Sequence, residues 1–122
     1  MVQDIRAKFE NAGNERAVIA SILNYSDLVV EAASKLSEDA FITTHHRILY
    51  SIILSLYHNG VEKFDFVSIV NKANDLNVLE EIGGAEYVGA LLNTPVSKSN
   101  FEYYLNRVVD SSTKYQLYMA AS

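Results

Sequence analysis

Residues 79–95 read Leu-Glu-Glu-Ile-Gly-Gly-Ala-Glu-Tyr-Val-Gly-Ala-Leu-Leu-Asn-Thr-Pro, and this stretch decides the fold. The double glycine, Gly83-Gly84, separates two apolar segments, and either glycine can take a positive φ without a Cβ clash. Pro95 disfavours helical geometry at Thr94, so a helix should end before it. The stretch therefore predicts a sharp corner, a short helix over about 85–93, and a break before the next helix.

Apolar residues recur at helical spacing on both sides of this stretch. The helix over 45–58 is apolar around much of its circumference, which predicts that it is the central helix. We expect an all-α, compact bundle. The first two further helices are predicted over Glu15–Tyr25, capped by Asn14, and over Asp27–Leu36, capped by Ser26. The next two are predicted over His45–His58, capped by Thr43 or Thr44, and from Asp65 as cap to about Leu76, with Phe66, Ile69, Val70 and Ala73 facing in. A last helix should follow Ser97 or Ser99 as its cap.

The composition fits one globular domain of ordinary size. The chain has 122 residues and no cysteine, so it can bury a single core but has neither disulfides nor thiolate metal sites. Ten basic and fifteen acidic residues give a formal net charge of −5, which argues against a nucleic-acid-binding surface. No apolar run approaches the ~20 residues of a membrane span, and the first residues lack a signal-peptide pattern. We therefore expect a cytoplasmic chain that contacts neither nucleic acid nor membrane directly.

Three pairs of adjacent residues invite a chemical interpretation, but none supports one. His45 and His46 point about 100° apart on a helix, so they cannot share a metal; a helix cap with one half-buried ring is the expected role. Glu80-Glu81 precedes a turn with no nucleophile or base nearby in sequence, which is typical of a solvated face. Gly83-Gly84 lacks the Gly-x(4)-Gly-Lys-(Ser/Thr) pattern of a phosphate-binding loop. We expect no catalytic, cofactor or metal site, and no ATP hydrolysis by this chain.

Several motifs occur in an order that matches one family. Gly-Gly-x-x-Tyr-Val-x-x-Leu, then Thr-Pro, then Asn100 and Tyr104, resembles the N-terminal domain of the DnaB family, the replicative hexameric DNA helicases of bacteria and their phages. Residues 15–23, Glu-Arg-Ala-Val-Ile-Ala-Ser-Ile-Leu, are similar to the family's first helix. The resemblance covers residues 14–118. Its other matching positions are Phe41, His45 or His46, Ile48-Leu49-Tyr50, Ile53, Leu56, Gly60 and Asp65.

The resemblance implies an orthogonal bundle of about six short helices, followed by one arm of a helical hairpin. Residues 1–13 would be a polar lead, residues 14–95 the globular head, and residues 96–122 the first arm. The last helix reaches the end of the chain without a helix-ending glycine or proline. We therefore expect a truncated hairpin.

The resemblance also implies a function in DNA replication. Such domains form a collar, mediate subunit association, and contact primase and, in some systems, the helicase loader. Tyr87 matches the family's primase-contact tyrosine. ATP and magnesium would bind only to a motor domain outside this chain, in a hexameric, ATP-dependent helicase. The expected self-association residues form an apolar stripe along the last helix: Phe101, Tyr104, Val108, Tyr115 and Tyr118.

Two alternatives remain open at this point. The helicase-binding domain of a primase has a similar fold, although it lacks the ordered Gly-Gly/Thr-Pro/Asn set. A stand-alone phage or plasmid replication adaptor could use the same head. The last helix also departs from the family, because Tyr115 or Gln116 occupies the place of its arginine. A motor domain encoded downstream would support the helicase, and a stop codon soon after Ser122 would support the adaptor.

Overall fold

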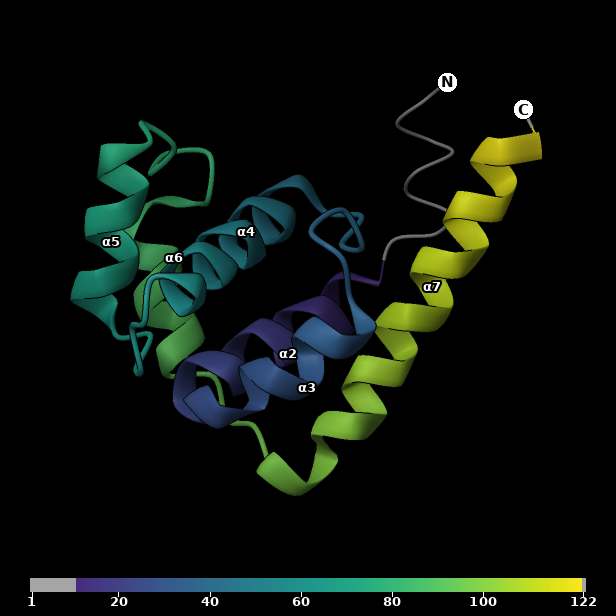
Figure 1. The fold of residues 1–122 in the computed structure, drawn as a ribbon, viewed down its shortest axis with the longest axis horizontal. Coiled ribbons are helices and arrows are strands. Elements are labelled where there is room, and N and C mark those ends of the chain that lie inside the picture. Colours follow the sequence, from purple (N-terminus) through teal and green to yellow (C-terminus); the bar gives the residue numbers. More distant parts are fainter. Residues whose placement is uncertain (1–10, 122) are drawn as a thin grey trace.

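The computed structural model describes residues 11–121, and within that range all regular secondary structure is helical (Figure 1). The predicted all-α class is confirmed. Six α-helices and two 3₁₀ turns follow in the order α2 (Ala12–Asn24), η1 (Ser26–Leu28), α3 (Val29–Lys35), α4 (Thr44–His58), α5 (Phe66–Asp75), α6 (Gly84–Leu92), η2 (Lys98–Asn100) and α7 (Phe101–Ala121).

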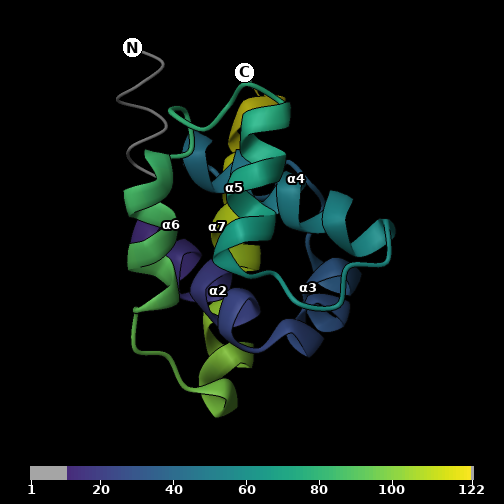
Figure 2. The same cartoon turned by 90° about the vertical axis from the view of Figure 1, so that its left-hand side faces the viewer.

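The helix at the centre of the bundle is α2. It packs against α4, α6, α7 and η1, whereas α4 packs against α2, α3 and α5. Figure 2 shows α2 between α6 and α3. The prediction that the helix over 45–58 is central is therefore wrong, although α4 is deeply buried through Leu49 and Ile53. The difference arises because the long α7 packs on α2.

The central helix begins three residues earlier than predicted. Its N-cap is Asn11 rather than Asn14, and the Asn11 carbonyl accepts the Glu15 N–H at 2.9 Å. Asn14 Nδ2 donates to Asn11 Oδ1 at 2.6 Å, and Asn11 Nδ2 donates to Ser111 Oγ on α7 at 3.2 Å. These side-chain bonds hold α2 helical through Gly13. The rest of the expected polar lead, residues 1–10, lies outside the described residues.

Three corners share one hydrogen-bond pattern. Each places a residue at positive φ just after a helical turn: Gly60 at 84°, Asn77 at 58° and Gly83 at 100°. The N–H of that residue and the N–H of the next both donate to carbonyls of the preceding turn, which is the Schellman arrangement. The predicted corners at Gly60 and at the double glycine are confirmed. The pairs are Gly60→Tyr57, Val61→Leu56, Asn77→Asn74, Val78→Ala73, Gly83→Glu80 and Gly84→Leu79.

Helix α5 follows its prediction at the start but not on every face. Asp65 is its N-cap, and Asp65 Oδ1 accepts the Ser68 N–H at 2.8 Å, as expected. Ile69 is buried, whereas Phe66, which we expected to face the core, is 40% exposed. Phe66 lies in the first turn, where it lines a surface hollow together with Tyr25.

The last helix belongs to the head for its first half only. Phe101, Leu105 and Val108 are buried at i, i+4, i+7 spacing, and α7 packs on α2. No described residue of α7 after Val108 is buried. In Figure 1 the second half of α7 runs on past the end of α2. One core therefore continues across the expected division at residue 95.

The two glycines before α6 give a matched test of the corner. Gly83 and Gly84 both have positive φ, and a Cβ on Gly83 would lie 2.8 Å from the Tyr87 Cβ, whereas a Cβ on Gly84 would meet nothing within 4 Å. Gly84→Ala should lower the free energy of unfolding by about 1 kcal/mol. Gly83→Ala should cost clearly more because it adds a clash. Urea unfolding of both variants measures the difference.

Gly89→Ala is the control for that experiment. Gly89 lies within α6, and a Cβ there meets nothing within 4 Å. Alanine should therefore be neutral or stabilise the helix by up to about 1 kcal/mol. Equal effects at Gly83 and Gly89 would contradict the corner account.

Candidate functional site

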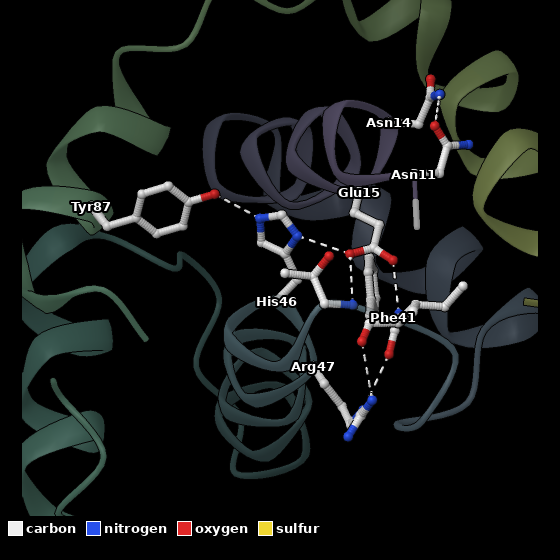
Figure 3. Close-up of polar contacts among 9 residues, drawn as sticks. Asn11, Asn14, Glu15, Phe41, His46, Arg47 and Tyr87 are labelled. Carbon is white, nitrogen blue, oxygen red and sulfur yellow. Dashed lines mark hydrogen bonds and ion pairs between the residues drawn. The ribbon is translucent and has the colours of Figure 1, made fainter. Parts of the chain in front are cut away.

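A buried carboxylate joins α2 to the start of α4. Glu15 lies in the first turn of α2 and is only 1% exposed. Its Oε2 accepts the backbone N–H of Ile42 at 2.8 Å, and its Oε1 accepts the N–H of Thr43 at 3.3 Å. The same Oε1 lies 2.9 Å from Nδ1 of His46 (Figure 3). One side chain thus fixes the entry of the chain into α4.

The side-chain cap predicted from threonine is absent at the start of α4, and Glu15 bonds the chain just before this helix. Thr43 does occupy the N-cap of α4, as one of the two predicted positions, but its side chain caps nothing. Its hydroxyl is buried and has no hydrogen-bond partner within the described part of the chain. Glu15 instead accepts the N–H groups of Thr43 and of Ile42 before it, so its charge lies beside the N-terminus of α4, where the helix dipole favours a negative charge.

The hydrogen bonds keep Glu15 ionised in spite of its burial. Burial alone raises the pKa of Glu15, but the bonds from His46, Ile42 and Thr43 outweigh it, so the pKa lies below its usual value of 4.5. An ionised carboxylate accepts Nδ1–H of His46, so in the singly protonated ring Nε2 is the acceptor. The Tyr87 hydroxyl, 2.6 Å from Nε2, is then the donor.

The two histidines have different roles, and one differs from expectation. His46 is 1% exposed rather than half-buried, because its two ring nitrogens face Glu15 and Tyr87. His45 is partly exposed, and its ring meets the ring of Tyr87 edge to face at 5.1 Å between centroids. Residues 11–121 contain no group of three or more His, Cys, Asp or Glu that could hold a metal ion.

Tyr87 is the outer end of this network. Its ring is partly exposed, and the Arg16 guanidinium lies 5.5 Å from the ring centroid, within cation–π range. Burial raises the pKa of Tyr87, so the hydroxyl remains a donor near neutral pH. Arg16 also donates from Nε and Nη2 to Thr94 Oγ1, at 3.3 and 3.1 Å, beside Pro95.

Residues from four separate motifs therefore meet in one place. We call this group the α2 polar cluster. Sequence reasoning did not assign Glu15 a role, yet a signal was available: Glu15 precedes Val18, Ile19 and Ile22 by three, four and seven residues. A charge on the apolar stripe of a helix needs buried partners. The cluster consists of Glu15, Arg16, His45, His46, Gly83, Tyr87 and Thr94.

The structure separates the predicted self-association stripe into two sides. Two residues of the predicted stripe, Phe101 and Val108, are buried in the chain's own core, where α7 packs on α2. Tyr104 and Tyr115 are partly buried, and Tyr118 is exposed. The predicted stripe omitted three exposed apolar residues of α7, which are Tyr103, Leu117 and Met119.

Comparison with known proteins decides the family. A family model, described as the DnaB-like helicase N terminal domain, matches residues 7–110, which include the whole α2 polar cluster. The chain belongs to this family. The resemblance inferred from the motifs is thereby confirmed.

Relatives of this DnaB-like domain are replicative helicases. The chain is 28% identical to the replicative DNA helicase DnaC of Bacillus subtilis over 113 residues, which are 93% of the chain and 25% of that relative. It is 30% identical to the replicative DNA helicase DnaB of Leifsonia xyli over 98 residues, 80% of the chain and 21% of that relative. The chain thus spans a quarter or less of the length of these relatives.

A solved structure confirms the fold of the DnaB-like domain. The N-terminal domain of DnaB helicase from Mycobacterium tuberculosis superposes with a TM-score of 0.85 at 26% sequence identity. The alignment covers 92% of this chain and 79% of that chain.

Among the described helices, none is long and apolar enough to cross a membrane.

The buried carboxylate gives a pH test. The pKa of Glu15 is lower in the folded chain than its usual value of 4.5. The ionised side chain therefore contributes fully to the free energy of unfolding above about pH 4.5, and this contribution is lost as the pH falls through the pKa of Glu15 in the folded chain. Glu15→Gln cannot titrate and should lower the free energy of unfolding by about 2–4 kcal/mol at neutral pH. Urea unfolding from neutral to acid pH should show the gap between wild type and Glu15→Gln narrowing below about pH 4.5. A constant gap would contradict an ionised Glu15.

Proposed function

We propose that this chain is the protein-interaction domain of a replicative DNA helicase, with α7 mediating association between subunits and the face around Tyr87 contacting a partner. The observation that carries the proposal is the division of α7 into a buried first half and an exposed, partly apolar second half. Membership in the DnaB-like family supports it. The parent would be a hexameric, ATP-dependent helicase that binds ATP and magnesium in a separate motor domain.

The association surface lies on the second half of α7. Leu117 is 65% exposed and Met119 is 45% exposed, and neither belongs to the core. Apolar side chains that gather on a projecting helix are suited to cover by another protein chain. Tyr104, Tyr115 and Tyr118 would contribute from the flanks, since tyrosine is enriched at interfaces.

The partner surface is the outer side of the α2 polar cluster. The Tyr87 hydroxyl is hydrogen-bonded to His46, so a partner would meet the ring of Tyr87 together with Arg16 and His45. We propose primase as the first partner, because Tyr87 matches the family's contact position, and a helicase loader as a second. The acidic net charge of −5 favours protein partners over nucleic acid.

A crossover experiment tests the two surfaces together. Leu117→Asp should weaken self-association, measured by sedimentation, by about tenfold or more, and leave primase binding unchanged. Tyr87→Ala should weaken binding of the cognate primase by a similar factor, measured by calorimetry, and leave self-association unchanged. Val108→Asp is unsuitable because the charge would enter the core and unfold the head.

Two control variants make the outcome specific. Val67 is 61% exposed, a fraction close to the 65% of Leu117, but it lies on α5. Val67→Asp should therefore not affect association through α7. Tyr87→Phe keeps the ring and removes only the bond to His46, so it should retain primase binding. Equal effects of Leu117→Asp and Val67→Asp would contradict the α7 surface. Equal effects of Tyr87→Phe and Tyr87→Ala would contradict a ring contact.

A further inference from the structure

The corner after α4 contains a dipeptide that is reactive in its own right. Asn59-Gly60 is the one Asn-Gly pair among the ten asparagines of the sequence. In such a pair the glycine nitrogen can attack the Cγ of the asparagine side chain, because no Cβ on the glycine hinders the approach. Both residues are exposed, and Gly60 lines a surface hollow of about 320 Å³, so water reaches this corner. All reactants for converting the side-chain amide to an acid therefore meet at the end of α4.

The folded geometry keeps these reactants apart. Asn59 is the C-cap of α4, with a φ of −91° and a ψ of 10°. A cyclic imide can form only when the Gly60 nitrogen lies on the same side of the Cα–C bond as the Asn59 Cβ. At a ψ of 10° that nitrogen is instead nearly eclipsed with the backbone nitrogen of Asn59. The Gly60 N–H also donates to the Tyr57 carbonyl at 3.1 Å, so the closed corner suppresses the reaction.

Contacts beyond the glycine hold the corner closed. The Val61 N–H donates to the Leu56 carbonyl at 3.0 Å, which is the second bond of the Schellman arrangement. The Val61 side chain is partly buried and packs against the core, and Phe64 is 1% exposed. Rotation of ψ at Asn59 would break both hydrogen bonds and draw Val61 away from the core. Such a local opening at a helix end costs less free energy than unfolding of the whole domain.

We propose that Asn59 is a self-modification site that reacts when the corner after α4 opens. The Gly60 nitrogen forms a bond to the Asn59 Cγ, and the bond from Cγ to the side-chain nitrogen breaks. That nitrogen leaves as ammonia and takes up the proton of the Gly60 N–H. Water then adds to either carbonyl of the cyclic imide and cleaves its bond to the imide nitrogen, which gives isoaspartate or aspartate at position 59. Water is the only co-reactant.

Either product would weaken the corner that produced it. Both products place a carboxylate at the C-terminus of α4, where the helix dipole disfavours a negative charge. Isoaspartate also adds one carbon atom to the main chain before Gly60, so the two hydrogen bonds of the corner cannot both keep their geometry. Val61 would then lose its fixed position against the core. The modification therefore marks chains in which the end of α4 has opened.

The rate of conversion in the folded and the unfolded chain tests the proposal. The chain is incubated at mildly alkaline pH with or without denaturant, and peptide mass spectrometry measures isoaspartate and aspartate at every asparagine. In denaturant, Asn59 should convert faster than the nine other asparagines, each of which precedes a residue with a side chain. In the folded wild type, Asn59 should convert about tenfold or more slowly than in denaturant.

Two variants separate opening of this corner from general destabilisation. Val61→Ala keeps the Asn-Gly pair and removes part of the packing, so it should speed conversion of the folded chain about threefold or more and leave the rate in denaturant unchanged. Val78→Ala is the matched control, because Val78 holds the same place in the Asn77 corner. Its N–H donates to the Ala73 carbonyl at 2.9 Å, and its side chain also packs, partly buried, against the core.

The control should leave conversion at Asn59 within about twofold of the folded wild type. Three results would overturn the proposal. They are no conversion of Asn59 in denaturant, equal rates in the folded and unfolded wild type, and equal acceleration by Val61→Ala and Val78→Ala.

Discussion

The buried carboxylate of Glu15 is the constraint on which the arrangement of the helices depends. A charge removed from water is tolerated only where hydrogen-bond donors replace the lost solvation. The donors of Ile42 and Thr43 come from the loop before α4, and His46 comes from the first turn of that helix. Because the two N–H groups and the imidazole converge on one carboxylate, α4 has little freedom to shift or turn relative to α2. The apolar packing of Val18, Ile19, Leu49 and Ile53 then forms around a fixed crossing.

The same constraint extends to α6 and gives Tyr87 two roles at once. His46 connects the Glu15 carboxylate to the Tyr87 hydroxyl through its two ring nitrogens. The partly exposed ring of Tyr87 contacts both Arg16 and His45. The close approach of Gly83 to the Tyr87 Cβ explains why the corner has a glycine there. The motifs scattered along the sequence are therefore parts of one contact cluster. A tyrosine whose hydroxyl is used internally can still offer its ring to a partner.

The sequence was most informative where local chemistry decides the structure. Asp65 as a cap, Gly60 and Gly83 as corners and the all-helical class follow from spacing and from backbone preferences. The errors concern which helices pack together. The early start of α2 depends on bonds between Asn11 and α7, and the burial of Val108 depends on α2 covering that side of α7. Neither contact can be read from periodicity alone. The role of Glu15 could have been suspected from its place on an apolar stripe, but its partners lie 27 to 31 residues away.

The tautomer of His46 tests this account most directly. If Glu15 is an ionised acceptor and Tyr87 a donor, the imidazole must carry its proton on Nδ1 and leave Nε2 bare. Long-range ¹H–¹⁵N NMR of the histidine rings, recorded at about pH 8 where an imidazole is ordinarily neutral, distinguishes the two nitrogens. The account predicts a single Nδ1–H tautomer for His46, and a change in the Nε2 shift in Tyr87→Phe. A proton on Nε2 alone, or a mixture of the two tautomers like that of an exposed histidine, would contradict it.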